Sequence, residues 1–182
     1  VPDGFNINEN CGSTHIENLT QMVRQGNYDL GVAFDGDADR CLAVDEQGEL
    51  VDGDMLLAIF GQWMKKTGTL QKDCIVATVM SNLGFFRFAG QEGLRTEQTK
   101  VGDRYVLENM REHGYNIGGE QSGHVIFLDD TTTGDGLLSA LHLLEVMVDT
   151  AKPLSELAAI MEVLPPALVH AKVPNQQHEP FT

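Results

Sequence analysis

The clearest pattern near the start of the chain is an apolar run that stops abruptly at a group of aspartates. Residues 29–34 are mostly apolar, residues 35–40 read Asp-Gly-Asp-Ala-Asp-Arg, and residues 41–44 are apolar again. Short apolar runs bounded by glycine and aspartate are typical of buried strands joined by loops. The pattern therefore predicts a strand, an acidic loop and a second strand, with a turn at residues 46–49.

A helix is predicted over residues 55–66, because apolar side chains recur there at helical spacing. Asp54 can cap the first turn, and Gly68 follows the last turn as a stop signal. We expect a new structural unit to start near Asp52. The recurring apolar residues are Leu56, Ile59, Phe60 and Trp63.

Strands and helices alternate along the rest of the chain. Strands are expected at residues 75–79 and 94–99, helices at 82–91 and 103–113, and two short strands at 115–117 and 125–128 around a glycine-rich loop. A helix over 134–148 has Leu137, Leu141, Leu144 and Val148 on one face, and a last helix covers 154–161 before Pro165-Pro166. This order predicts an α/β fold, a layered mixed sheet with flanking helices, preceded by the last strands of another α/β domain.

Composition narrows the choice of partners. The 27 acidic residues outnumber the 12 basic ones and give a formal net charge of −15, which argues against nucleic acid as a partner. A phosphorylated ligand would have to be bound through a metal ion or a local basic group. The three cysteines are far apart and suggest neither a disulfide framework nor a zinc site, and no apolar run approaches the length of a membrane span. We expect a cytoplasmic protein without a membrane partner.

The acidic loop is a candidate metal site. Asp35, Asp37 and Asp39 alternate with small residues, which lets the chain curl so that three carboxylates converge. Carboxylate oxygens in such a turn suit a hard cation such as Mg²⁺, whereas three empty carboxylates would repel one another. Arg40 can pair with a carboxylate or reach a phosphate oxygen.

Three other interpretations use the same residues. The loop can be a solvated acidic turn, or a calcium helix-loop-helix site, whose loop wants acids at positions 1, 3, 5 and 12 and glycine at position 6. Glu46 fits position 12, but Arg40 stands at position 6 and the flanking residues indicate strands. Phosphatases that form an aspartyl-phosphate also place Asp-x-Asp after an apolar strand, and there Asp35 would be the nucleophile.

Four motifs in order resemble the α-D-phosphohexomutases. The acidic loop at 35–40 is similar to the metal-binding loop of this family, and Gly-Glu-Gln-Ser-Gly-His at 119–124 is similar to its sugar-recognition loop. Thr-Lys-Val-Gly-Asp-Arg-Tyr-Val at 99–106 and Thr-Thr-Thr-Gly-Asp-Gly at 131–136 resemble the bacterial branch that acts on glucosamine phosphates. The similarity extends from about Phe5 to about Val169.

The resemblance implies a domain organisation. Proteins of this family have four domains, so residues 1–53 would be the end of domain 2, residues 54–168 domain 3, and residues 169–182 the start of the linker to domain 4. The chain begins at Val1 without a methionine, and we expect both ends to be cuts in a longer protein. The phosphate-carrying serine of domain 1 and the phosphate-gripping loop of domain 4 would then be outside this chain, which should be inactive alone.

The resemblance also assigns roles to residues. Asp35, Asp37 and Asp39 would hold Mg²⁺, and Glu120 and Ser122 would bind the 3- and 4-hydroxyls of a hexosamine phosphate. Lys100 and His124 are the candidates for acid and base, and Arg40 would assist at the phosphate. The implied reaction interconverts glucosamine 6-phosphate and glucosamine 1-phosphate through a phosphoserine and a bisphosphate intermediate. A sister mutase for mannose or glucose phosphates and a metal- or sugar-phosphate-binding module without catalysis remain alternatives.

Overall fold

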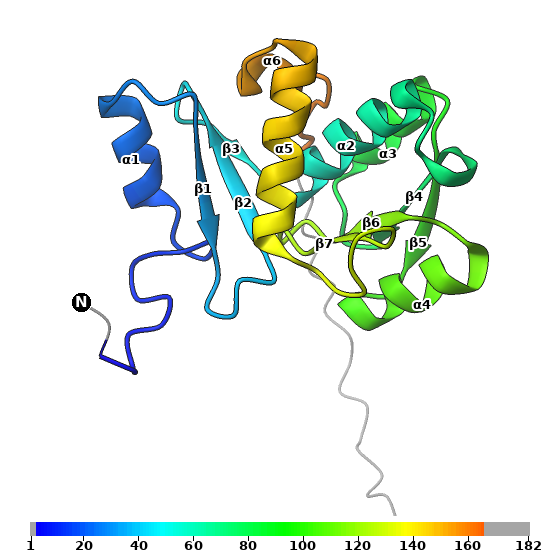
Figure 1. Ribbon diagram of the computed structural model, residues 1–182, viewed down its shortest axis with the longest axis horizontal. Coiled ribbons are helices and arrows are strands. Elements are labelled where there is room, and N and C mark those ends of the chain that lie inside the picture. Colours follow the sequence, from blue (N-terminus) through cyan, green and yellow to red (C-terminus); the bar gives the residue numbers. More distant parts are fainter. Residues whose placement is uncertain (1–2, 166–182) are drawn as a thin grey trace, which may run out of the picture.

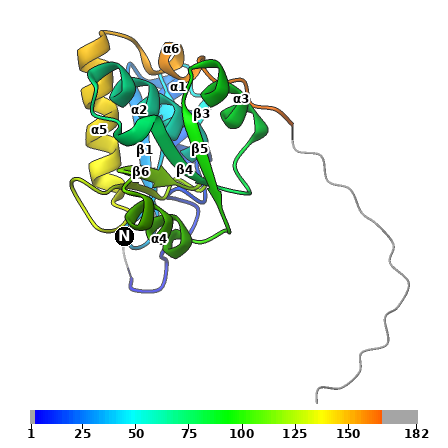
Figure 2. The same ribbon diagram turned by 90° about the vertical axis from the view of Figure 1, so that its right-hand side faces the viewer.

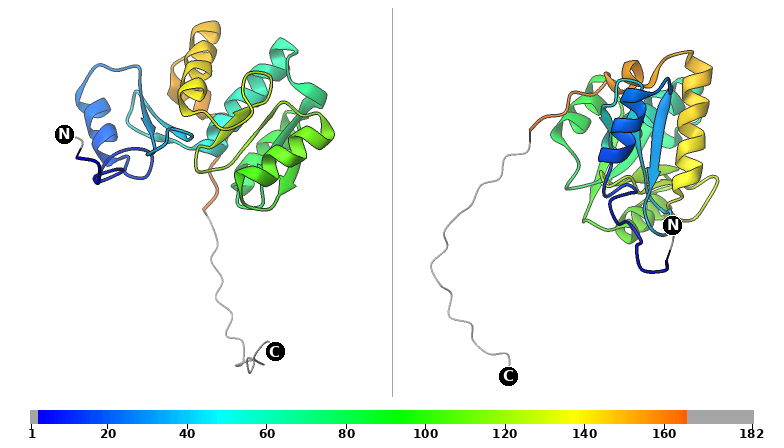
Figure 3. Two further views of the ribbon diagram at one scale, coloured as in Figure 1. Left: turned by 60° about the horizontal axis from the view of Figure 1, so that its bottom comes forward. Right: turned by 90° about the vertical axis from the view of Figure 1, so that its left-hand side faces the viewer.

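A computed structural model describes residues 3–165 of the chain and shows two sheets side by side, with one long helix between them (Figures 1 and 3). The first sheet contains β1 (Leu30–Phe34), β2 (Cys41–Asp45) and β3 (Leu50–Val51), all antiparallel. The second contains four strands in the order β5-β4-β6-β7. The predicted α/β fold class is confirmed.

The first sheet is a hairpin that the acidic loop closes. β1 and β2 pair from Leu30 opposite Asp45 to Phe34 opposite Cys41, so the loop at 35–40 leaves one strand and enters the other directly. Helix α1 (Glu17–Gln25) packs against Gly31, where a side chain would collide with Leu19. Helix α5 (Gly136–Thr150) approaches Phe34 on the other face of the hairpin. The predicted strands at 29–34 and 41–44 are confirmed, whereas α1 and the short β3 were not expected.

The second sheet is a parallel arrangement with one antiparallel edge. β4 (Cys74–Thr78) lies between β5 (Arg95–Thr99) and β6 (Ile117–Gly119) and is parallel to both, and β7 (Val125–Phe127) runs antiparallel to β6. Helix α4 (Asp103–His113) covers one face, while α2 (Gly53–Thr67) and α3 (Leu83–Gln91) cover the other (Figures 1 and 2). The carboxyl ends of β4, β5 and β6 therefore share one edge, where ligands of open α/β sheets usually bind.

The start of α2 differs from the prediction. Asp52, and not Asp54, caps the helix: its side chain accepts a hydrogen bond of 3.0 Å from the backbone N–H of Met55. Asp54 is already inside the first turn and fully buried, and its Oδ2 accepts a hydrogen bond of 2.6 Å from the backbone N–H of Asn82. Two aspartates two residues apart both match the capping preference, so the sequence pattern alone selected the wrong one.

The predicted apolar face of α5 is exposed. Its members Leu137, Leu141, Leu144 and Val148 are 60%, 55%, 42% and 78% exposed, whereas Ala140, Leu143 and Val146 face the core. The helix is apolar on both sides, and its buried side combines Leu143 and Val146 with the small residues Gly136, Ser139 and Ala140. Helix α6 (Leu154–Ala158) follows and is shorter than the predicted 154–161. In the described part of the chain, no helix combines the length and the hydrophobicity needed to span a membrane.

Candidate active site

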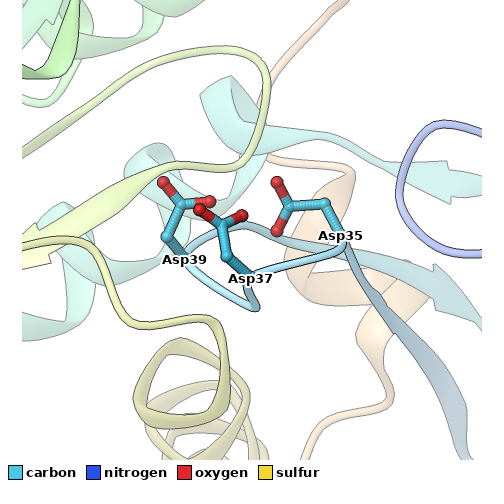
Figure 4. A group of neighbouring side chains, drawn as sticks. All are labelled: Asp35, Asp37 and Asp39. Carbon is cyan, nitrogen blue, oxygen red and sulfur yellow. The ribbon is translucent and has the colours of Figure 1, made fainter. Parts of the chain in front are cut away.

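The three aspartates of the acidic loop converge. Asp35, Asp37 and Asp39 each offer a carboxylate oxygen, and these oxygens all lie within 4.8 Å of one another. Figure 4 shows the three side chains pointing to the same side of the loop. Ala38 has φ of 60°, a left-handed conformation that bends the chain between the last two aspartates. Because antiparallel strands flank the loop, the structure excludes a helix-loop-helix calcium site here.

Arg40 neutralises part of this negative charge. Its Nε is 2.9 Å from Oδ2 of Asp35 and 3.7 Å from Oδ1 of Asp39. Burial acts to raise the pKa of Asp35, but the hydrogen bond from the backbone N–H of Arg40 and the charge of its guanidinium outweigh burial, and the pKa is lowered. Asp35 is therefore held as a carboxylate.

The pKa of Asp39 is shifted in the opposite direction to that of Asp35. Burial and then the charge of Asp35 raise the pKa of Asp39. Its Oδ1 is buried and has no hydrogen-bond partner among the described residues. A buried oxygen without a hydrogen bond, in a group of three converging carboxylates, fits a hard divalent cation that takes oxygen ligands. The loop is therefore suited to Mg²⁺.

The loop at 119–124 is a tight turn between β6 and β7. The backbone N–H of Glu120 donates to the carbonyl oxygen of His124, and that of Gly123 donates to the carbonyl oxygen of Glu120, both at 3.0 Å. Gly123 has φ of 95°, which glycine adopts without strain. Ser122 is exposed at the turn, and Glu120 is half-buried. Both polar side chains are thus available to a ligand.

Backbone contacts join this turn to the acidic loop. Arg40 and His124 form an isolated antiparallel bridge, and the backbone N–H of Cys41 donates to the carbonyl oxygen of Gly123 at 3.1 Å. Nε2 of His124 lies 3.5 Å from Oδ2 of Asp39. The structure therefore brings Asp35, Asp37, Asp39, Arg40 and His124 together at one place, next to the loop with Glu120 and Ser122.

Lys100 belongs to the loop that contacts Glu120 through Gly102. It directly follows β5, its side chain is exposed, and its Nζ is 5.9 Å from the ring centroid of Tyr105. The backbone N–H of Gly102 donates a hydrogen bond of 2.9 Å to Oε1 of Glu120, which ties the Lys100 loop to the turn. Within residues 3–165 Lys100 forms no ion pair with the three aspartates.

The sequence did not reveal that Gly53 and Gln121 support the candidate site. The backbone N–H of Gly53 donates to the carbonyl oxygen of Gln121 at 3.0 Å, and Nε2 of Gln121 donates to Oδ2 of Asp52 at 3.2 Å. The start of α2 therefore supports the turn at 119–124. A Cβ on Gly53 would be 2.1 Å from the carbonyl oxygen of Glu120. The sequence offered one signal for this contact: Gly53 stands in the first turn of a helix, where glycine lowers stability.

The architecture is that of an α/β enzyme domain, with polar loops gathered at the carboxyl ends of parallel strands and beside an acidic loop. Residues 52–164 match the family described as phosphoglucomutase/phosphomannomutase, alpha/beta/alpha domain III, and residues 5–48 match domain II of the same family. The chain belongs to the phosphoglucomutase/phosphomannomutase family.

Similar curated proteins carry a more specific name. The chain is 57% identical over 178 residues to a phosphoglucosamine mutase of Clostridium acetobutylicum, covering 98% of this chain and 40% of that protein. It is 58% identical over 180 residues to a phosphoglucosamine mutase of Acetivibrio thermocellus, covering 99% of this chain and 40% of that protein. The chain thus spans about 40% of the length of the relatives that it matches.

Solved structures share the fold. A phosphoglucomutase/phosphomannomutase family protein from Burkholderia thailandensis superposes with a TM-score of 0.73 at 27% identity, covering 86% of this chain and 33% of that chain. An Aspergillus fumigatus N-acetylphosphoglucosamine mutase, in complex with GlcNAc-6P and magnesium, gives a TM-score of 0.68 at 20% identity, covering 87% of this chain and 38% of that chain. The first of these likenesses agrees with the family assignment, and the second concerns the fold alone.

Proposed function

We propose that this chain is the metal- and sugar-binding part of a mutase that interconverts glucosamine 6-phosphate and glucosamine 1-phosphate. The observation that carries the proposal is the junction of two loops: the converging aspartates are joined through Arg40 and Cys41 to the turn with Glu120 and Ser122. The identity of 57% to 58% with curated phosphoglucosamine mutases supports this substrate. The reaction would pass through a phosphoserine and a bisphosphate intermediate.

In this proposal, Asp35, Asp37 and Asp39 hold Mg²⁺, which would supply positive charge next to the migrating phosphoryl group. Arg40 keeps Asp35 ionised and in place through its Nε. Its side chain is 39% exposed, so the guanidinium can also approach a phosphate oxygen.

Glu120 and Ser122 bind the sugar. Oε1 of Glu120 is already occupied by the backbone N–H of Gly102, and its second oxygen can accept a hydrogen bond from a sugar hydroxyl. The hydroxyl of Ser122 adds another contact. Contacts to the 3- and 4-hydroxyls work in both orientations of a hexose phosphate, because these hydroxyls lie near the axis about which the bisphosphate must turn.

Proton transfer requires a group that reaches the reacting oxygens. Lys100 and His124 are the candidates from the sequence. Lys100 is exposed on the loop that Gly102 joins to the turn at 119–124, whereas the side chain of His124 is 5% exposed and lies against Asp39. We assign proton transfer first to Lys100, since geometry must allow a direct approach to the substrate.

The proposed domain division places residues 1–53 at the end of domain 2 and residues 54–168 in domain 3. Residues 169–182, the proposed linker, lie outside the described residues. Domain 1 would supply the phosphoserine, and domain 4 would bind the substrate phosphate. The full-length enzyme would be cytoplasmic. The 182-residue chain alone should therefore convert neither glucosamine phosphate. Turnover by the purified chain would contradict this assignment of roles to domains 1 and 4.

A phosphomannomutase or phosphoglucomutase is the second candidate, because the matching family bears both names. Kinetics of the full-length enzyme with glucosamine, glucose and mannose phosphates separate the two. We expect the highest kcat/KM with glucosamine phosphate, and Glu120→Ala should lower all three values by similar factors. An equal or higher kcat/KM with mannose phosphate would favour the second candidate, and a loss confined to one sugar would contradict the shared role of Glu120.

A further inference from the structure

The loop at residues 131–136 has no role in the function proposed so far. It follows β7 and leads into α5, whose first turn is capped by Asp135: its Oδ1 accepts a hydrogen bond of 3.0 Å from the backbone N–H of Leu138. The loop lies directly against the acidic loop, although about 95 residues separate the two in the sequence. Its two buried glycines, Gly134 and Gly136, make the contacts.

Gly136 holds the strained residue of the acidic loop. Its backbone N–H donates a hydrogen bond of 2.9 Å to the carbonyl oxygen of Ala38. Ala38 is left-handed, a conformation that a residue with a side chain keeps only when its surroundings fix it. A Cβ on Gly136 would be 2.5 Å from the carbonyl oxygen of Arg40, so only glycine permits this approach.

Gly134 makes room for the ring of His124. A Cβ on Gly134 would lie 2.4 Å from Nε2, 2.5 Å from Cδ2 and 2.7 Å from Cε1 of this ring. The ring is buried, and neither of its nitrogens has a hydrogen bond among the described residues. Its Nε2 lies on the side of Asp39, 3.5 Å from Oδ2. The space above Gly134 thus determines where His124 meets Asp39.

We propose that the loop at 131–136 positions the acidic loop for its metal. Gly136 fixes Ala38, and Gly134 seats His124 so that its imidazole supports Asp39. His124 is then a positioning residue that acts through Asp39. This inference rests on the proposed metal site and deepens it, because residues that orient a metal ligand typically change metal affinity by about 10- to 100-fold when they are replaced.

The test is the affinity of the 182-residue chain for Mn²⁺, measured by electron paramagnetic resonance with Mg²⁺ as competitor. Gly134→Ala should weaken Mn²⁺ binding by about 10-fold or more, and His124→Ala should weaken it to a similar extent. In the His124→Ala background, adding Gly134→Ala should change little further, because the ring that the methyl group would displace is gone. Gly90→Ala is the matched control, since a Cβ there meets nothing within 4 Å.

The outcomes separate the two proposals. Binding of Mn²⁺ by the unchanged chain and its loss in Asp37→Asn would support the metal site. If Gly134→Ala then binds Mn²⁺ as tightly as the unchanged chain does, the positioning role is wrong. If the unchanged chain shows no Mn²⁺ binding, the metal site itself is wrong.

A second measurement needs no metal and no variant. The amide of Gly136 should exchange with deuterium slowly, because it donates to Ala38. Exchange at the rate of a free amide would overturn the proposal even if Gly134→Ala fails to fold.

Discussion

Glu120 accepts a hydrogen bond of 2.9 Å from the backbone N–H of Gly102, a residue eighteen positions earlier in the chain. This bond joins the loops that follow β5 and β6, and it fixes one carboxylate oxygen while the other is left for a ligand. Gly102 has φ of 128°, a conformation that residues with a side chain rarely adopt. The position of the candidate sugar-binding carboxylate therefore depends on a glycine outside its own turn.

Gly102→Ala should weaken sugar-phosphate binding in the full-length enzyme. Alanine keeps the backbone N–H but is strained at φ of 128°, and relief of this strain turns the N–H away from Glu120. The hydrogen bond to a charged group that is then lost is worth about 1.5–3 kcal/mol, or roughly 10- to 150-fold in affinity. We expect the Kd for glucosamine 6-phosphate, measured by calorimetry, to rise within this range. Gly90→Ala is the control, and an unchanged Kd for Gly102→Ala would show that the bond does not position Glu120.

Gly53→Ala should destabilise the chain although alanine favours helices. The added Cβ would lie 2.1 Å from the carbonyl oxygen of Glu120 and 2.7 Å from the backbone nitrogen of Gly123, so the turn must move. Such overpacking typically costs about 1–3 kcal/mol, which exceeds the gain in helix propensity. Urea unfolding measures the difference. If the variant is as stable as the unchanged chain or more stable, the turn at 119–124 moves without a loss in the free energy of unfolding, and the prediction is wrong.

Asp54 should make stability depend on pH. Burial raises the pKa of Asp54 from 3.8 to about 6, with a smaller contribution from the charge of Asp52. Well below pH 3.8 the carboxyl is protonated in both the folded and the unfolded state, and this effect on stability is absent. As the pH rises toward 6 and beyond, the unfolded chain ionises more readily, and the folded state loses at most about 3 kcal/mol relative to it.

Asp54→Asn should remove this loss, since an amide oxygen can still accept the hydrogen bond from Asn82. The measurement is the free energy of unfolding in urea between pH 4 and pH 7, compared between the variant and the unchanged chain. Asp149→Asn, which alters an exposed carboxylate of α5, is the control. Parallel pH profiles for Asp54→Asn and the unchanged chain would contradict the prediction.

The three cysteines should differ in reactivity. Burial raises the pKa of the Cys41 thiol to about 12 and also raises that of Cys74, whereas Cys11 is exposed. Because the thiolate is the reactive form, a disulfide reagent at pH 8 should modify Cys11 rapidly and the other two only after unfolding. Counting released thiolate before and after addition of guanidinium tests this, and Cys11→Ser should abolish the fast phase.

Local patterns in the sequence were sufficient for most elements, because apolar runs, helical periodicity and stop signals mark them; β5, which reads Arg-Thr-Glu-Gln-Thr, is an exception. The strand at 29–34, the acidic loop and the helix at 103–113 were predicted within one residue of their observed bounds. The choice between the two apolar sides of α5 was not predictable, because it depends on which side meets the hairpin. The contacts of Gly53, Gly102 and Gly134 were equally hidden, since each depends on a chain segment distant in sequence.

The bridge between Arg40 and His124 has a consequence for the order of folding. It closes a loop of more than eighty residues, so we expect it to form late, after the β6–β7 hairpin of the second sheet. The hairpin of β1 and β2 can pair early by itself, but the final shape of its acidic loop has to wait for that long-range contact. Interactions made after the transition state change the rate of unfolding and leave the rate of folding nearly unaltered. A cation bound by Asp35, Asp37 and Asp39 would accordingly lengthen the lifetime of the native state without hastening its formation.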